Sequence, residues 1–265
     1  MLFRSNVKVP KPVDKVVSDK DLKAADAVFG VLYKADDVTV TSMQRLMSAG
    51  LLGEQKNRRL VPTRWAITAV DDIIGKGLVP SIHNLPEIDK YYTFFGEYLD
   101  NKFMVLFAPG QWKYEMNECW NASTLWNQPV PGIDTYYSPV PVIINDFELE
   151  YGRKNYAGNV TGAYYAARKE IEEFLFTSHR QASVIVFREV AGGYIVPLGV
   201  WVIRETVKKA LAEGWKGENV RIHETLKDAV NRLREVFEVP VKYWLAASNL
   251  IRYMKTQYKL DRWIK

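Results

Sequence analysis

The chain has 265 residues, of which 48% are hydrophobic and 13% aromatic. It can therefore bury a sizeable core, as one large domain or two closely packed ones, and a disordered protein is excluded. Of its 36 basic and 31 acidic residues, six basic and one acidic lie from Lys242 onward, and the other 30 of each kind cancel. Such a balanced body is a poor candidate for strong non-specific DNA binding, although a local basic patch is compatible with it.

Cysteine content and hydropathy narrow the class of protein further. Cys119 is the single cysteine, which excludes a disulfide within the chain and a thiolate zinc site. No apolar run approaches the roughly 20 residues that cross a bilayer, and the charged, proline-containing N-terminus does not resemble a signal peptide. We therefore expect a soluble, cytoplasmic protein.

The first 50 residues predict two helices. Residues 1–17 show no clear period, and we expect an extended lead-in. Ser18 and Asp21 form a capping-box pattern before a helix that carries Leu22, Ala25, Val28, Phe29 and Leu32. A second helix is predicted over residues 41–49, with Gly50 as its stop. This pair is more typical of ordinary core packing than of a helix-turn-helix.

Residues 60–72 read LVPTRWAITAVDD, which closely resembles a signature of the archaeal Nre family of DNA repair proteins. Residues 15–23 (KVVSDKDLK), 44–53 (QRLMSAGLLG) and 197–201 (PLGVW) agree with it, in the order of the family. The resemblance implies a role in DNA repair. Typical members are longer at the N-terminus, where a cysteine cluster often looks like a zinc site, so the resemblance is to the C-terminal part of the family.

A basic cluster lies within and before this signature, formed by Lys56, Arg58, Arg59 and Arg64 beside Trp65. One interpretation is phosphate contact by the basic residues, with the tryptophan stacking on a base. The other is a solvated loop with Trp65 in the core. The sequence leaves both open.

Four carboxylates are weak catalytic candidates. Asp71 and Asp72 are adjacent in the first turns of a predicted helix and so point to different sides of it. Asp146, Glu148 and Glu150 occupy every second position of a strand-like run, so the three share one face. Such a face could hold a divalent cation, the one cofactor that the sequence suggests, but it is more often merely solvated.

The middle of the chain predicts strands. Residues 91–99 and 103–107 flank a turn and indicate a hairpin, and residues 112–120 alternate as a third strand. Glu118 lies on the apolar face of that strand, where structural pairing is more frequent than catalysis. Residues 128–141 hold four prolines and mark a long functional loop or an internal boundary.

The second half mixes helices and strands. A helix over residues 162–177 follows a glycine-containing entry that is a weak anion-site signal. Residues 182–190 are strongly β, and residues 194–196 are predicted as their hairpin partner. Further helices are expected up to residue 212 and over residues 224–237. None of the three histidines has metal-ligand spacing with another. The whole indicates an α+β protein with a mainly antiparallel sheet and helices at both ends.

The C-terminal nine residues resemble the PCNA-interacting peptide (PIP box) that docks proteins on the sliding clamp. The pattern is Gln257, Leu260, Trp263 and Ile264, with Ile264 in place of the usual second aromatic residue. One turn gathers the last three into an apolar plug that a partner groove can bury. The alternative is the end of a terminal helix. Its apolar stripe would leave the plug exposed, because the stripe holds Trp244, Ala247, Ile251, Met254 and Tyr258.

Three functions follow from these patterns. The first is a DNA repair protein with a single domain over residues 1–256 and a clamp-binding tail over residues 257–265. The second is a metal-dependent nuclease or phosphoesterase that uses the four carboxylates. The third is a single-stranded DNA binding module built on the basic cluster.

Overall fold

The computed structural model describes residues 9–121, 124–125, 141–196 and 198–261, the last five by their backbone only. Contacts within the chain divide it into two compact units, Met1–Gly77 and Leu78–Lys265. The predicted boundary at residues 128–141 lies almost wholly outside the described residues. No helix in the part of the chain that the structure describes is both long and apolar enough to cross a membrane.

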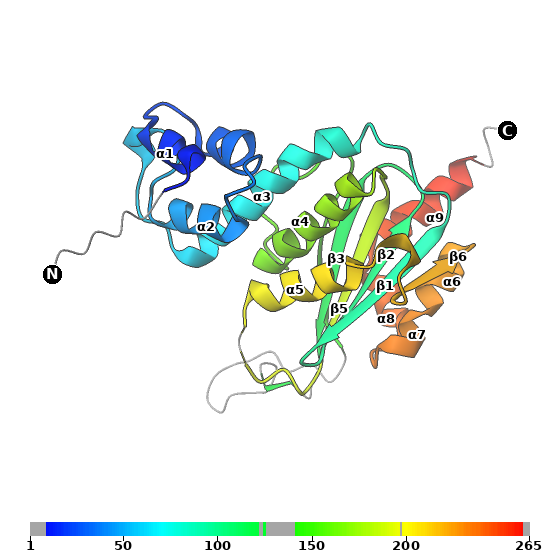
Figure 1. Ribbon diagram of the computed structural model, residues 1–265. Coiled ribbons are helices and arrows are strands. Elements are labelled where there is room, and N and C mark those ends of the chain that lie inside the picture. The colour runs from blue at the N-terminus through cyan, green and yellow to red at the C-terminus, as the bar shows by residue number, and fades with distance from the viewer. Residues whose placement is uncertain (1–8, 122–123, 126–140, 197, 262–265) are drawn as a thin grey trace. The chain divides into compact units, whose positions relative to one another are not determined.

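The N-terminal unit is helical (Figure 1). Its elements are α1 (Lys11–Ser18), the π-helix η1 (Asp26–Leu32), α2 (Val40–Ser48), the short 3₁₀ turn η2 (Gln55–Asn57) and α3 (Thr63–Ile82), whose last five residues belong to the second unit. The buried side chains that hold the unit together include Val16, Val28, Leu32, Met43, Ala66, Val70 and Ile74.

Two expectations for this unit are corrected. The extended lead-in is wrong, because residues 11–18 form α1, which starts after Pro10 and buries Val13 and Val16 on one face. The capping box at Ser18 is also wrong. The helical element η1 starts at Asp26 without a side-chain cap, and Asp19 Oδ1 instead accepts hydrogen bonds in the preceding turn, from the backbone N–H groups of Asp21 and Leu22, both at 3.0 Å.

The second predicted helix is confirmed as α2. Thr39 caps its N-terminus by accepting a hydrogen bond from the backbone N–H of Ser42 at 3.1 Å. Gly50 ends it with a positive φ of 70°. A Cβ atom at this position would lie 2.5 Å from the carbonyl oxygen of Arg59, so only glycine lets the basic loop pass this closely.

A six-stranded sheet forms the centre of the second unit, in the order β4-β3-β5-β2-β1-β6. Among the strands that the structure describes, only β3 and β5 pair in parallel, so the predicted α+β class with a mainly antiparallel sheet is confirmed. The strands are β1 (Tyr91–Tyr98), β2 (Asn101–Ala108), β3 (Lys113–Trp120), β4 (Ile143–Glu148), β5 (Ser183–Val190) and β6 (Val220–His223).

The β1–β2 hairpin is confirmed, but the predicted partner of β5 is wrong. Residues 194–196 form no strand, and β5 pairs with β2 on one side and β3 on the other. All eight residues of β5 are buried, as expected for a central strand with both edges and both faces covered.

Helices cover both faces of this sheet (Figure 1). On one face lie α4 (Gly162–Thr177) and α5 (Val200–Leu211). There the ring centre of Phe174 lies 5.6 Å from that of Phe107 of β2. On the other face lies a group of C-terminal helices, where the ring centre of Trp244 lies 5.7 Å from that of Phe187 of β5. That group comprises α6 (Leu226–Asn231), α7 (Leu233–Val236), α8 (Val241–Ala247) and α9 (Asn249–Asp261).

The C-terminal helices are shorter than predicted. The helix expected over residues 224–237 is divided into α6 and α7. The terminal helix is interrupted at Ser248, whose backbone is extended. Buried Glu115 of β3 causes this break, because its carboxylate accepts hydrogen bonds from the Ser248 hydroxyl and from the backbone N–H of Asn249 at 2.6 Å. The apolar stripe projected across residues 244–258 therefore does not exist as one helical face.

Candidate nucleic-acid interface

The basic loop and the first turn of α3 place large side chains in water. Leu60 is 82% exposed and Trp65 is 60% exposed. The interpretation of Trp65 as a core residue is therefore wrong. The guanidinium carbon of Arg64 lies 5.9 Å from the centre of the Trp65 ring, within cation–π range. Arg59 and Arg64 are exposed as well. We call Arg59, Arg64 and Trp65 the arginine–tryptophan surface.

Arg58 and Lys56 differ from these neighbours. The Arg58 guanidinium donates hydrogen bonds to the carbonyl oxygens of Gly53 and Val17, both at 2.7 Å, and to those of Val16 and Asp19. It thereby fastens the end of α1 to the loop after α2, which makes it a structural residue. The Lys56 ammonium lies 3.4 Å from the carboxylate of Glu54. The predicted basic cluster is thus only partly available to a ligand.

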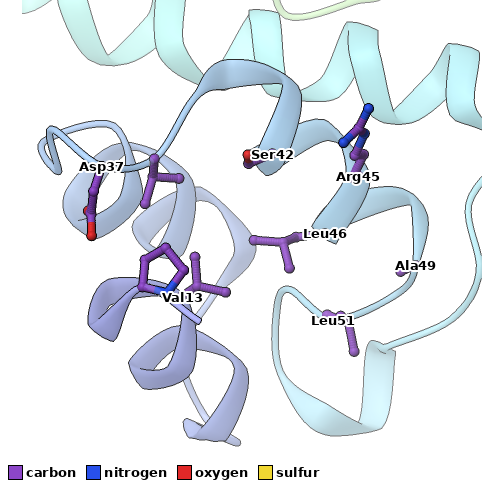
Figure 2. A pocket seen from close by; sticks show the side chains of 9 residues that line it. Val13, Asp37, Ser42, Arg45, Leu46, Ala49 and Leu51 are labelled. Atoms are coloured by element: carbon purple, nitrogen blue, oxygen red, sulfur yellow. The ribbon is translucent and has the colours of Figure 1, made fainter. Parts of the chain in front are cut away.

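Two hollows flank Arg45 of α2 in the same unit. The first, of about 350 Å³, is mostly apolar and lies among the start of α1, the turn before α2 and α2 itself. Figure 2 shows Asp37 and Arg45 on opposite sides of it. The second, of about 420 Å³, lies between α2 and the start of α3. It is lined by Thr41, Gln44, Arg45, Ser48, Ala49, Leu60, Thr63 and Ile67, and we call it the α2–α3 cavity.

The division into units also changes the meaning of the net charge. Residues 1–77 contain 13 basic and nine acidic residues, a net charge of +4. Residues 78–241 contain 17 basic and 21 acidic residues, a net charge of −4 that conceals this excess in the whole-chain count. The N-terminal unit is therefore basic, with an exposed arginine–tryptophan pair on it.

The carboxylates of α3 do not form a pair. Asp71 is buried and accepts a hydrogen bond from the side-chain amide of Gln44 at 3.4 Å. Asp72 lies on another side of the helix and makes an ion pair with Lys76 at 2.7 Å. This agrees with the expectation that adjacent carboxylates on a helix diverge.

The carboxylates of β4 are buried and bound by other groups of the fold. Asp146 Oδ2 accepts hydrogen bonds from the backbone N–H groups of Asn159 and Val160, at 2.9 and 2.8 Å, and its other oxygen lies 3.0 Å from Arg153. Glu148 accepts a hydrogen bond from Arg168 at 2.8 Å.

Their face of β4 is therefore neither solvated nor arranged as a cation site. Glu150 follows the strand and lies 3.8 Å from Lys113. Across the described residues, no group of three or more histidine, cysteine, aspartate or glutamate side chains is placed to hold a metal ion.

Glu118 is paired structurally, as the sequence predicted. Its carboxylate accepts hydrogen bonds from Arg188 of β5 and, at 2.7 Å, from the indole N–H of Trp120. Arg188 also donates to Asn101 at 3.1 Å, and its guanidinium lies 5.3 Å from the centre of the Trp120 ring. The pair is almost completely buried, so its charges are committed to the fold.

The structure describes only part of the predicted clamp peptide. Helix α9 continues to Asp261, so the backbones of Gln257 and Leu260 are helical. Their side chains, together with Trp263 and Ile264 as whole residues, lie outside what the structure describes. The assignment of these four residues to a clamp contact stays a prediction.

Comparison with known proteins places the chain in a family. Residues 1–127 match the family model described as archaeal Nre, N-terminal, and residues 148–263 match archaeal Nre, C-terminal. The expectation that only the C-terminal part of the family is represented is therefore not confirmed. The two matches are separated by a segment that contains the proline-rich residues 128–141. No solved structure matches the chain.

Three curated relatives are similar over most of the chain. DNA repair protein NreB of Archaeoglobus fulgidus is 36% identical over 95% of this chain and 60% of its own length. DNA repair protein NreA of Haloferax volcanii is 36% identical over 88% of this chain and 52% of its own length. NreA of A. fulgidus is 39% identical over 78% of this chain and 49% of its own length. The chain spans only about half to three fifths of these relatives. By the two matches and these identities, it belongs to the archaeal Nre family.

Proposed function

We propose that this protein acts in DNA repair and is held at the sliding clamp by its C-terminal peptide. The names of its relatives, DNA repair proteins NreA and NreB, support the repair role. The sequence of residues 257–264 is the single observation that carries the clamp contact. Tethering by such a peptide raises the local concentration of the attached units at sites where the clamp is loaded.

The position of the peptide suits this role. Its first residues belong to the last turns of α9, whose N-terminal end is fixed to β3 by Glu115. Leu260, Trp263 and Ile264 are spaced so that one helical turn brings them together, and Gln257 can both donate and accept hydrogen bonds beside them. Basic residues around the motif favour encounter with an acidic partner surface.

Calorimetry with purified PCNA tests the clamp contact. We expect the full chain to bind and the double variant Leu260→Ala, Trp263→Ala to lose binding. A matched control changes two positions that the motif leaves free, Tyr258→Ala with Asp261→Ala, and should bind like the parent protein. Equal binding by all three proteins would refute the clamp contact and leave the repair role to rest on family membership.

A second candidate function is the binding of single-stranded DNA by the arginine–tryptophan surface. The observation that favours it is the 60% exposure of Trp65 with Arg64 against its ring. An exposed indole with a cation beside it offers a stacking platform for a base and a charge for the adjoining phosphate. The net charge of +4 on the N-terminal unit supports the same function.

Fluorescence anisotropy with a labelled oligothymidylate tests this second function. Trp65→Ala should weaken binding by about tenfold, because stacking of one base on an aromatic ring contributes roughly 1–3 kcal/mol. Trp201 is 50% exposed but lies in the other unit, so Trp201→Ala is the matched control and should have no effect. Equal affinities for the two variants would count against the surface.

No specific observation favours the metal-dependent nuclease. Among its four candidates, Asp72, Asp146 and Glu148 form ion pairs with Lys76, Arg153 and Arg168, and Asp71 bonds to Gln44.

A further inference from the structure

We infer that the α2–α3 cavity binds one nucleotide, with the base inside and the phosphate on Arg45. This inference rests on the DNA contact proposed for the same unit, and it assigns a second subsite to that unit. The cavity has about 420 Å³, within the range of about 300–1,000 Å³ that small-molecule sites occupy.

The lining combines apolar walls with polar edges, as a heteroaromatic base requires. Ala49, Leu60 and Ile67 supply the apolar part. The polar part comes from the hydroxyl groups of three residues and from one amide, contributed by Thr41, Ser48, Thr63 and Gln44. A base taken out of its stack is recognised in this way, through apolar contact with its faces and hydrogen bonds to its edge.

Two of the polar groups are held in defined orientations. Gln44 is buried, and its side-chain nitrogen donates to buried Asp71 at 3.4 Å, which leaves the carbonyl oxygen as the acceptor for a base N–H. Ser48 Oγ donates to the carbonyl oxygen of Val61 at 2.8 Å and lies 3.4 Å from Thr63 Oγ1. Since the Ser48 proton goes to Val61, Thr63 is the donor in the contact between the two hydroxyl groups, and both hydroxyl oxygens are left to accept hydrogen bonds from a base.

The charge of the lining selects a phosphate-bearing ligand. None of the residues that line the α2–α3 cavity is acidic, whereas the neighbouring hollow has Asp37 opposite Arg45 (Figure 2). Arg45 is exposed at the edge of the cavity. Arg59 and Arg64 adjoin the lining residues Leu60 and Thr63 in the chain. A nucleotide phosphate would thus meet arginine without a competing carboxylate in the lining.

Leu60 gives the cavity an exposed apolar surface. A leucine side chain that is 82% exposed leaves most of its apolar surface in water, although it lines a concave site. A base seated against it would remove that surface from water. This makes Leu60 the position at which substitutions report on the ligand with least effect on folding.

The test compares three substitutions in the full chain. Leu60→Asp removes the apolar wall and places a negative charge where the phosphate approaches, and Leu60→Phe keeps a wall that can stack. Leu51→Asp is the matched control, because Leu51 is an exposed leucine of the same unit that lines the other hollow. Each protein is titrated with a labelled oligothymidylate, with the same strand carrying one abasic position, and with the four free deoxynucleoside monophosphates.

If the cavity takes a nucleotide of a DNA strand, Leu60→Asp weakens oligonucleotide binding by about tenfold relative to Leu51→Asp, whereas Leu60→Phe binds like the parent protein. The parent protein then also binds the strand with the abasic position less tightly. If the cavity takes a free nucleotide, the same pattern appears with a monophosphate alone. Equal binding of every ligand by Leu60→Asp and Leu51→Asp, or no binding by the parent protein, would overturn the inference.

The outcome separates this inference from the proposed DNA contact. Loss of oligonucleotide binding in Trp65→Ala, with Leu60→Asp unaffected, would retain the arginine–tryptophan surface and reject the cavity. Monophosphate binding that depends on Leu60, without any oligonucleotide binding, would retain the cavity and reject the DNA contact.

Discussion

The two units use charged side chains in opposite ways. In residues 78–265, Arg188 and Arg168 are buried and paired with the carboxylates of Glu118 and Glu148. In residues 1–77, a unit with a net charge of +4, Arg45, Arg59 and Arg64 are exposed. A buried charge must keep its partner, because leaving it alone in a low dielectric is costly. An exposed arginine can exchange water for a phosphate, so the smaller unit is the better candidate for ligand binding.

Exceptions on each side show that this contrast concerns environment and not sequence position. Arg58 belongs to the basic loop, yet it is occupied by backbone carbonyl groups. Arg221 belongs to the sheet, yet its pair with Glu235 is about half exposed at both side chains. These exceptions supply the controls for experiments that measure the contrast.

The largest expected effect is on Arg188. Arg188→Met would leave the Glu118 carboxylate buried without its counter-charge, and we expect the free energy of unfolding to fall by about 3–5 kcal/mol. Urea denaturation followed by circular dichroism measures this loss. The control Arg221→Met breaks an exposed pair and should cost less than about 1 kcal/mol. Similar losses for the two variants would show that burial does not separate these two pairs.

The next largest effect tests Arg58 as the exception in the N-terminal unit. Arg58→Ala removes the donor to the carbonyl oxygens of Gly53, Val17 and Val16, and we expect a loss on the order of 2 kcal/mol, since hydrogen bonds from a charged donor are the stronger ones. Amide hydrogen exchange in α1 should speed up accordingly. Arg59→Ala, one residue along, should leave exchange in α1 unchanged. If both variants behave alike, Arg58 has no special structural role.

Local patterns predicted much of this fold from sequence. Alternation gave the hairpin of β1 and β2 and the strand β3, and helical spacing with a glycine stop gave α2. These signals depend on residues a few positions apart. Pairing between distant segments was not predicted, because nothing near β5 indicates that β2 and β3 are its partners.

The predictions that were wrong also concern contacts between residues far apart in the sequence. The break between α8 and α9 depends on Glu115, which is 133 residues away from Ser248. The burial of Asp146 depends on backbone N–H groups of Asn159 and Val160, which lie beyond its own strand. A pattern of alternating carboxylates cannot reveal that other parts of the fold supply their partners.

The candidate site divides in the same way. Sequence located the basic cluster and its tryptophan, but it could not rank Arg58 and Arg59, which are adjacent and chemically identical. Their difference comes from the carbonyl groups at the end of α1, which only the fold brings to Arg58. The α2–α3 cavity was not predicted at all, because it forms only when residues 41–49 pack beside residues 60–67.

A smaller effect sharpens the contrast on the side of the N-terminal unit. If Arg59 and Arg64 contact phosphates of single-stranded DNA, replacing either by alanine should make the dependence of log K on log salt shallower by about 0.7. Anisotropy titrations over a range of salt concentrations measure the slope. Arg221→Ala alters an exposed arginine of the other unit and should leave the slope unchanged. Slopes that do not respond to Arg59 or Arg64 would mean that these arginines make no phosphate contact.

The smallest effect concerns His223, a half-buried residue of the larger unit whose side chain contacts another polar side chain of the sheet. Thr93 Oγ1 accepts a hydrogen bond from Arg232 at 2.7 Å and lies 2.9 Å from His223 Nε2. Since the threonine hydroxyl then has its proton free to donate, Nε2 is best placed as the acceptor of a neutral imidazole. Burial, aided by the charge of Arg232, lowers the pKa of His223 below its ordinary value of 6.5.

The sign of the pH effect follows from that lowered pKa. The unfolded chain binds the proton more readily than the folded one, so the contribution of His223 to stability is complete above the unfolded pKa of 6.5 and is lost as the pH falls through the folded value. His223→Gln keeps a group that can accept the hydrogen bond but does not titrate. Between about pH 7.5 and pH 5.5, the parent protein should therefore lose more stability than the variant in urea denaturation. Parallel losses in the two proteins would show that His223 is not held neutral, and that the polar contacts of the sheet edge are less committed to the fold than those at its centre.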